Sequence, residues 1–81
     1  MLRMEVKTKK DPTKVIQKIK EYLGEGGFGL ELKSETPQCL NFEGGGGFVS
    51  ATLCTQDGET QVALETREWE FQVKKLAAKI R

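Results

Sequence analysis

Residues 39–66 read CLNFEGGGGFVSATLCTQDGETQVALET, and most of the predicted sheet comes from this stretch. Apolar and polar residues alternate along three of its segments, residues 39–43, 48–55 and 60–66. Alternation with a period of two is typical of a strand that buries one face. Four glycines separate the first two segments, and Asp57-Gly58, a strong hairpin signal, separates the last two. The stretch therefore predicts three antiparallel strands joined by two hairpins.

Two more segments alternate in the same way, residues 2–8 and residues 28–36, before Pro37 interrupts the pattern. Five strands are therefore expected, and their apolar positions should form one buried face of a sheet. The expected inner face consists of Leu2, Met4, Val6, Leu30, Leu32, Leu40, Phe42, Val49, Ala51, Leu53, Val62 and Leu64.

Two segments have the 3.6-residue period of amphipathic helices. The first is expected from about Pro12 to Leu23, with Asp11 as its N-cap and a glycine-rich segment after it. The second begins near Glu68, with Thr66 as the expected N-cap, and runs to the end of the sequence. The order of elements predicts an α+β fold, β-α-β-β-β-β-α, with a curved antiparallel sheet and two helices packed on one face.

Eighty-one residues are enough for one core only, so residues 1–81 are expected to form a single domain. The element order resembles that of a half-repeat of the TATA-binding protein and, more distantly, the helix-grip fold of the Bet v 1 and START-like ligand binders. The segment FEGGGGF at residues 42–48 also resembles a glycine hairpin found in small proteins of the helix-grip type. The resemblance in element order implies a fold, and the resemblance of the glycine hairpin brings no activity with it.

The composition excludes several kinds of catalytic and metal site. The chain has no histidine and two cysteines, so it cannot supply a zinc site of four cysteines, or of two cysteines and two histidines, or an imidazole base. The glycine run does not match a Walker phosphate-binding loop, because Gly47 is followed by Phe48 and Val49 where a lysine, a Ser or Thr and a helix are needed, so a simple connection is favoured over a phosphate site. We therefore expect no enzyme, no cofactor and no metal.

The net charge of +1 does not favour nucleic acid as a partner, because proteins that neutralise phosphate groups usually have a basic excess. Basic residues do gather locally on the two expected helices, where they are either solvated or available to contact a phosphate backbone. A nucleic-acid-binding module of TATA-binding-protein-like fold is the alternative function. This candidate basic patch consists of Lys14, Lys18, Lys74, Lys75 and Lys79.

The sheet face opposite the helices is expected to carry small neutral side chains, although 31% of the chain is charged. Such a face is either solvated or meets another surface, most simply the same face of a second copy. Its two cysteines lie directly opposite each other if the hairpin turns on Gly46-Gly47 and diagonally if it turns on Gly45-Gly46, so a disulfide and two free thiols are both open. This candidate face consists of Cys39, Asn41, Phe48, Ser50, Thr52 and Cys54.

The expected function is that of a non-catalytic module that binds another protein or a ligand. The favoured partner is a second copy, bound through the open sheet face, or another protein. A small apolar ligand between sheet and helices is less favoured, because close packing normally fills that space. The apolar runs are only a few residues long, far below the roughly 18 to 20 needed to cross a membrane, so the expected location is the cytoplasm.

Overall fold

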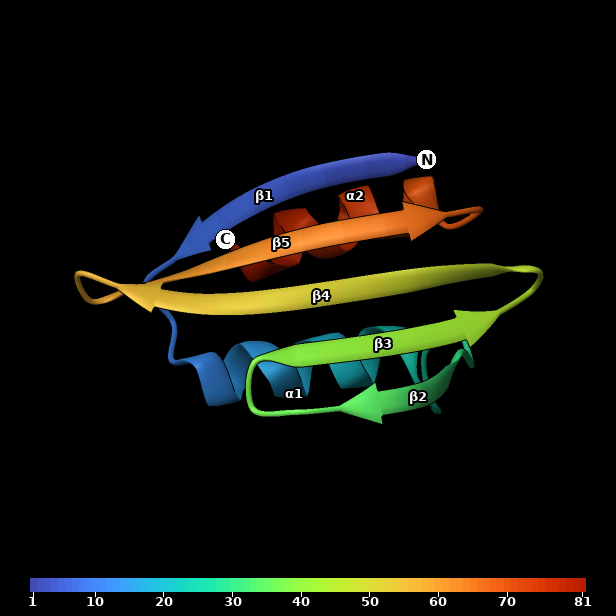
Figure 1. Cartoon of the computed structure of the whole chain (residues 1–81), viewed down its shortest axis with the longest axis horizontal. Helices are drawn as coiled ribbons and strands as arrows, with labels where there is room; N and C mark the ends of the chain where they lie inside the picture. Colours follow the sequence, from blue (N-terminus) through green and yellow to red (C-terminus); the bar gives the residue numbers. More distant parts are fainter.

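The computed structural model describes residues 1–81 and contains two helices and five strands. The elements are β1 Leu2–Thr8, α1 Pro12–Leu23, β2 Glu31–Glu35, β3 Cys39–Gly44, β4 Gly47–Gln56, β5 Glu59–Arg67 and α2 Glu70–Ile80. The strands form one antiparallel sheet in the order β1-β5-β4-β3-β2. In Figure 1 both helices lie behind this curved sheet, α2 behind β1 and β5 and α1 behind β3 and β2. The predicted α+β fold is confirmed.

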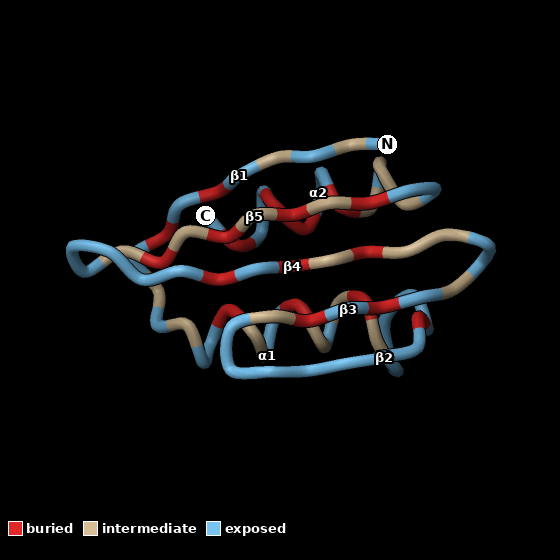
Figure 2. The backbone as a smooth tube through the Cα atoms, viewed as in Figure 1, coloured by how far each residue is buried: buried red, intermediate tan, exposed pale blue.

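One apolar core fills the layer between the sheet and the helices. It contains sixteen buried residues, and the red segments of Figure 2 show how they alternate with exposed or half-buried positions along the central strands. Nine of the twelve residues expected on the inner face are buried, while Leu2 and Met4 are half-buried and pack against the core. The helices contribute Val15, Ile19, Leu23, Val73, Leu76, Ala77 and Ile80 to it.

Strand β2 is shorter and more exposed than its sequence predicts. It begins at Glu31 rather than Phe28, because the backbone before Glu31 is still bonded to the C-terminal end of α1. The Leu30 N–H donates to the carbonyl of Leu23 at 2.8 Å. Leu32 lies opposite Phe42 on the helix side, as predicted, but it is 37% exposed. It is exposed because β2 is an edge strand, with no further strand beside it.

The second helix also begins later than predicted, and the N-cap prediction was wrong. Thr66 lies inside β5, where its hydroxyl donates to the carbonyl of Phe48 at 2.7 Å. The strand continues to Arg67, the chain turns at Glu68 with a φ of 75°, and α2 then starts without a side-chain cap on its N-terminal amides. Strand β5 therefore continues past Thr66, the residue predicted as the N-cap of the second helix.

The glycine run joins β3 to β4 and fixes the start of α2 against that hairpin. Gly45 and Gly46 form the turn with φ values of 58° and 84°, a left-handed conformation that suits glycine. A β-carbon at Gly47 would lie 2.1 Å from the carbonyl oxygen of Arg67, so no side chain fits there. The indole N–H of Trp69 donates to the carbonyl of Gly44 at 2.9 Å. The run thus has a packing role as well as a turning role.

Candidate functional site

The structure places all six residues of the candidate face on one side of the sheet, away from the helices. Along β4 the inward positions Val49, Ala51 and Leu53 are buried, so the alternate positions point to the open side. The antiparallel register then sets Asn41 opposite Ser50, and Cys39 opposite Thr52. Directly opposed side chains in a sheet project from the same face, so Cys39 and Asn41 join the four residues from β4.

Cross-strand pairing arranges the open face in rows that run across the sheet. Each row takes one residue from each neighbouring strand, and the side chains within a row are close enough to interact. In the order from β2 towards β1, the rows are Glu31, Glu43, Phe48 and Arg67; then Ser34, Asn41, Ser50, Glu65 and Arg3; then Cys39, Thr52, Ala63 and Glu5; then Cys54, Gln61 and Lys7.

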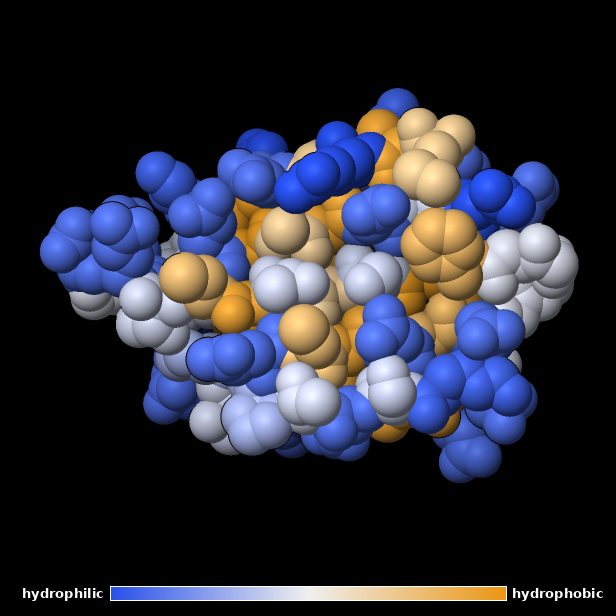
Figure 3. Space-filling model, viewed as in Figure 1, coloured by the Kyte–Doolittle hydropathy of each residue, from blue (hydrophilic) through white to orange (hydrophobic).

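The middle of β3 and β4 is neutral on this face, and charged side chains lie around it, among them Glu65 beside Ser50 and Glu43 at the hairpin end of β3. Figure 3 looks onto the open face and shows pale and orange atoms over the middle of the sheet, surrounded by blue hydrophilic atoms. Polar side chains bond along the face: the Asn41 amide donates to the Ser34 hydroxyl at 2.8 Å, and the Gln61 amide donates to the Glu5 carboxylate at 3.0 Å. Each bond joins an edge strand to its neighbour, and neither involves a residue of β4.

The two cysteines of the face are separate free thiols. The hairpin turns on Gly45-Gly46, so Cys39 lies opposite Thr52 and diagonally from Cys54. Diagonal neighbours in a sheet are about 7–8 Å apart, whereas a disulfide needs β-carbons about 3.8 Å apart. The structure therefore selects the diagonal register from the two that the sequence left open.

Two further residues belong to the open face, and the sequence pattern did not place either of them there. Strict alternation puts Ser34 on the helix side, but a bulge between Leu32 and Ser34 moves it opposite Asn41. The same shift turns Glu35 towards α1, where it forms an ion pair with Lys20. Arg67 was missed because the predicted strand ended one residue earlier.

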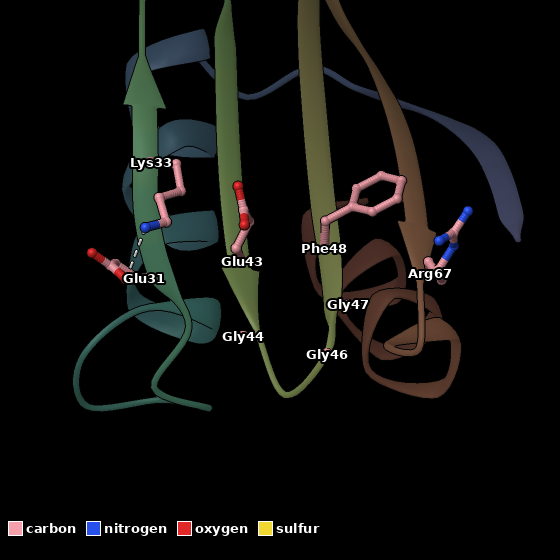
Figure 4. Close-up of a pocket in the computed structure, with 8 residues that line it drawn as sticks. All are labelled: Glu31, Lys33, Glu43, Gly44, Gly46, Gly47, Phe48 and Arg67. Carbon is pink, nitrogen blue, oxygen red and sulfur yellow. Dashed lines mark ion pairs between the residues drawn. The ribbon is translucent and has the colours of Figure 1, made fainter.

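The first row carries opposite charges on the two strands that flank β4. Its side chains surround a shallow hollow of about 620 Å³ beside the glycine hairpin, shown in Figure 4. Glu31 forms an ion pair with Lys33 at 3.2 Å, but neither Glu43 nor Arg67 has an ion-pair partner in the chain. A free carboxylate and a free guanidinium thus lie on either side of the half-buried Phe48.

The candidate basic patch lies on the opposite layer of the molecule. Lys14 and Lys18 are exposed on α1, and the other three lysines are exposed on α2. Only Lys18 and Lys79 line a common groove, of about 340 Å³, together with Glu21, Tyr22 and Leu76. The Lys79 ammonium lies 5.8 Å from the centre of the Tyr22 ring, and the Lys75 ammonium lies 4.7 Å from that of Phe71.

No family model matches this chain, and no curated protein is similar to it in sequence. Within the structure, no three Cys, Asp or Glu side chains are grouped so that they could hold a metal ion. Neither helix has the length and apolar character needed to cross a membrane. The open sheet face and the groove lined by Lys18 and Lys79 are the candidate sites on the surface.

Proposed function

We propose that this protein is a non-catalytic interaction module that associates with a second copy of itself through the open sheet face. The observation that carries the proposal is the neutral centre of that face. In a chain that is 31% charged, the six residues of the candidate face lie together on β3 and β4 and carry no formal charge. On this side of the two strands the charged residue is Glu43, at the hairpin end of β3. Charged residues are usually depleted at the centre of an interface and present at its rim.

The size of the face sets the expected strength of this association. Five strands about 4.8 Å apart, with about 3.4 Å per residue along the seven residues of β1, give a flat area of about 500 Å² per copy. Two copies would then bury about 1,000 Å², which is at the lower limit for specific interfaces. We therefore expect a dimer that dissociates on dilution.

The test is the solution mass by light scattering over a concentration series, in reducing and in non-reducing buffer. We expect the mass to rise from 9.1 kDa towards twice that value in both buffers. Thr52→Glu places a charge at the centre of the face and should hold the protein as a monomer. Lys14→Glu, on the exposed side of α1, is the matched control and should dimerise normally. A monomer at every concentration would contradict the proposal.

Binding of a small apolar ligand is less favoured than protein association as the role of this module. The sixteen core residues already occupy the layer between sheet and helices, which favours protein association over an internal apolar ligand. Two free thiols suit a reducing compartment, so we place this activity in the cytoplasm.

Nucleic-acid binding is the second candidate, supported by the groove in which Lys18 and Lys79 flank Tyr22. Basic side chains beside an aromatic ring are a common way to bind single strands. The resemblance to the TATA-binding protein would instead place nucleic acid on the sheet face, which is the layer without these lysines.

Fluorescence anisotropy with a labelled single-stranded oligonucleotide tests this candidate. Binding that weakens steeply with salt and with Lys18→Ala would favour it. Unchanged anisotropy at low salt would reject it.

A further inference from the structure

The free charges of the first row lie symmetrically about β4. Glu43 is opposite Phe48 on one side, and Arg67 is opposite Phe48 on the other. The carboxylate is therefore one strand from β4 towards β2, and the guanidinium is one strand from β4 towards β1. Figure 4 shows both side chains on the same side of the sheet as the Phe48 ring.

Two identical sheets that pack face to face are related by a two-fold axis lying between them. If that axis runs parallel to β4, a residue on β3 of one copy faces the residue of the same row on β5 of the second copy. We propose that the dimer has this axis, so that Glu43 of each copy pairs with Arg67 of the other and Phe48 packs against Phe48. This inference rests on the self-association proposed above and adds the orientation of the two copies.

The remaining rows are compatible with the same axis. In the second row Asn41 faces Glu65 of the second copy, and the Asn41 amide keeps one N–H for that carboxylate after donating to Ser34. In the third row Cys39 faces Ala63, and both are small. Each residue of β4 faces the same residue of the second copy, so Thr52 packs against Thr52. No like charges oppose each other across the three central strands.

An axis perpendicular to the strands is less favourable. It would bring Arg3 opposite Glu5 of the second copy, but only on the edge strand β1. It would also set Phe48 against Cys54 and would cover Glu43 and Arg67 without giving either an opposite charge. Charges that lose water without gaining a partner oppose association, so the axis parallel to β4 is preferred.

Charge reversal tests the axis. Glu43→Arg and Arg67→Glu each place like charges opposite each other twice in the dimer. At low ionic strength each should therefore raise the dissociation constant about tenfold or more. The double variant Glu43→Arg/Arg67→Glu restores both pairs and should return the constant to within about threefold of the original. Sedimentation velocity gives these constants, and thermal melting followed by circular dichroism shows that each variant is folded.

The matched controls are Arg3→Glu, Glu5→Arg and the corresponding double variant. With the proposed axis they change the dissociation constant less than the Glu43 and Arg67 variants and show no rescue. Loss and rescue at Arg3 and Glu5 would instead establish the perpendicular axis. If Thr52→Glu dissociates the dimer but no charge reversal changes its dissociation constant, the proposed axis is wrong and the open-face dimer is still supported. A protein that never dimerises would overturn both.

The two cysteines provide a second, independent test. Cys54 is on β4 and so lies near the proposed axis, whereas Cys39 is one strand away and its two copies are separated sideways by two strands. The single-thiol variant Cys39→Ser should therefore form a covalent dimer with a short bis-maleimide. Cys54→Ser should do so much less. The reverse order of yields would contradict the axis.

Discussion

Strands β1 and β4 have the same inward chemistry and different outward chemistry. On β1, buried Val6 alternates with the exposed residues Glu5 and Lys7, which is the ordinary pattern of a sheet with one solvated face. On β4, three buried apolar residues alternate with residues that are small or aromatic and uncharged. Alternation thus identifies both strands, whereas only the outward residues distinguish a solvated surface from one that a partner can cover.

The largest expected effect concerns the two sides of β4 itself. Leu53→Ala removes a buried side chain from the core and should lower the free energy of unfolding by about 2–5 kcal/mol. Thr52→Ala changes the neighbouring outward residue and should alter it by less than about 0.5 kcal/mol. Urea denaturation of both variants measures the difference. Equal losses of unfolding free energy would contradict the difference between the buried side and the outward side of β4.

A smaller effect is expected where β4 begins. Gly47→Ala forces a β-carbon against the carbonyl of Arg67, so the hairpin must shift, at a cost of about 1–3 kcal/mol. An alanine at Gly44 would meet only ordinary contacts with Leu30 and serves as the control. A melting temperature that falls no more for Gly47→Ala than for Gly44→Ala would contradict the packing role of the glycine run.

The smallest effect concerns the link between that hairpin and α2. Trp69→Phe keeps an aromatic ring but removes the indole N–H that donates to the carbonyl of Gly44. The expected loss of stability is about 1 kcal/mol, the typical contribution of one such bond. Chemical denaturation measures the loss. A variant as stable as the original protein would show that ring packing alone holds this contact.

The sequence predicted the architecture because its main signals are local. Period-two alternation located all five strands, and Asp57-Gly58 marked its hairpin, where both residues have positive φ. The bounds of β1 and α1 match the prediction residue for residue. Alternation also fixes which side of the sheet each residue of the candidate face occupies, so the sequence alone places all six together.

The sequence was insufficient where contacts between residues far apart in the chain set the local structure. The bulge in β2 has no signal in the sequence, so alternation could not place Ser34 opposite Asn41. Any two of four consecutive glycines can form a turn, so the sequence could not choose the cysteine register. Trp69 fits a helical stripe, yet its contact with Gly44 keeps it ahead of the first turn of α2.

The most direct test of the open-face dimer is a dilution series followed by amide chemical shifts in ¹⁵N-labelled protein. The account predicts concentration-dependent shifts concentrated at Asn41, Phe48, Ser50, Thr52 and Cys54, with the amides on the exposed side of α1 unchanged. Shifts that do not depend on concentration, or that cluster on the helices, would contradict it.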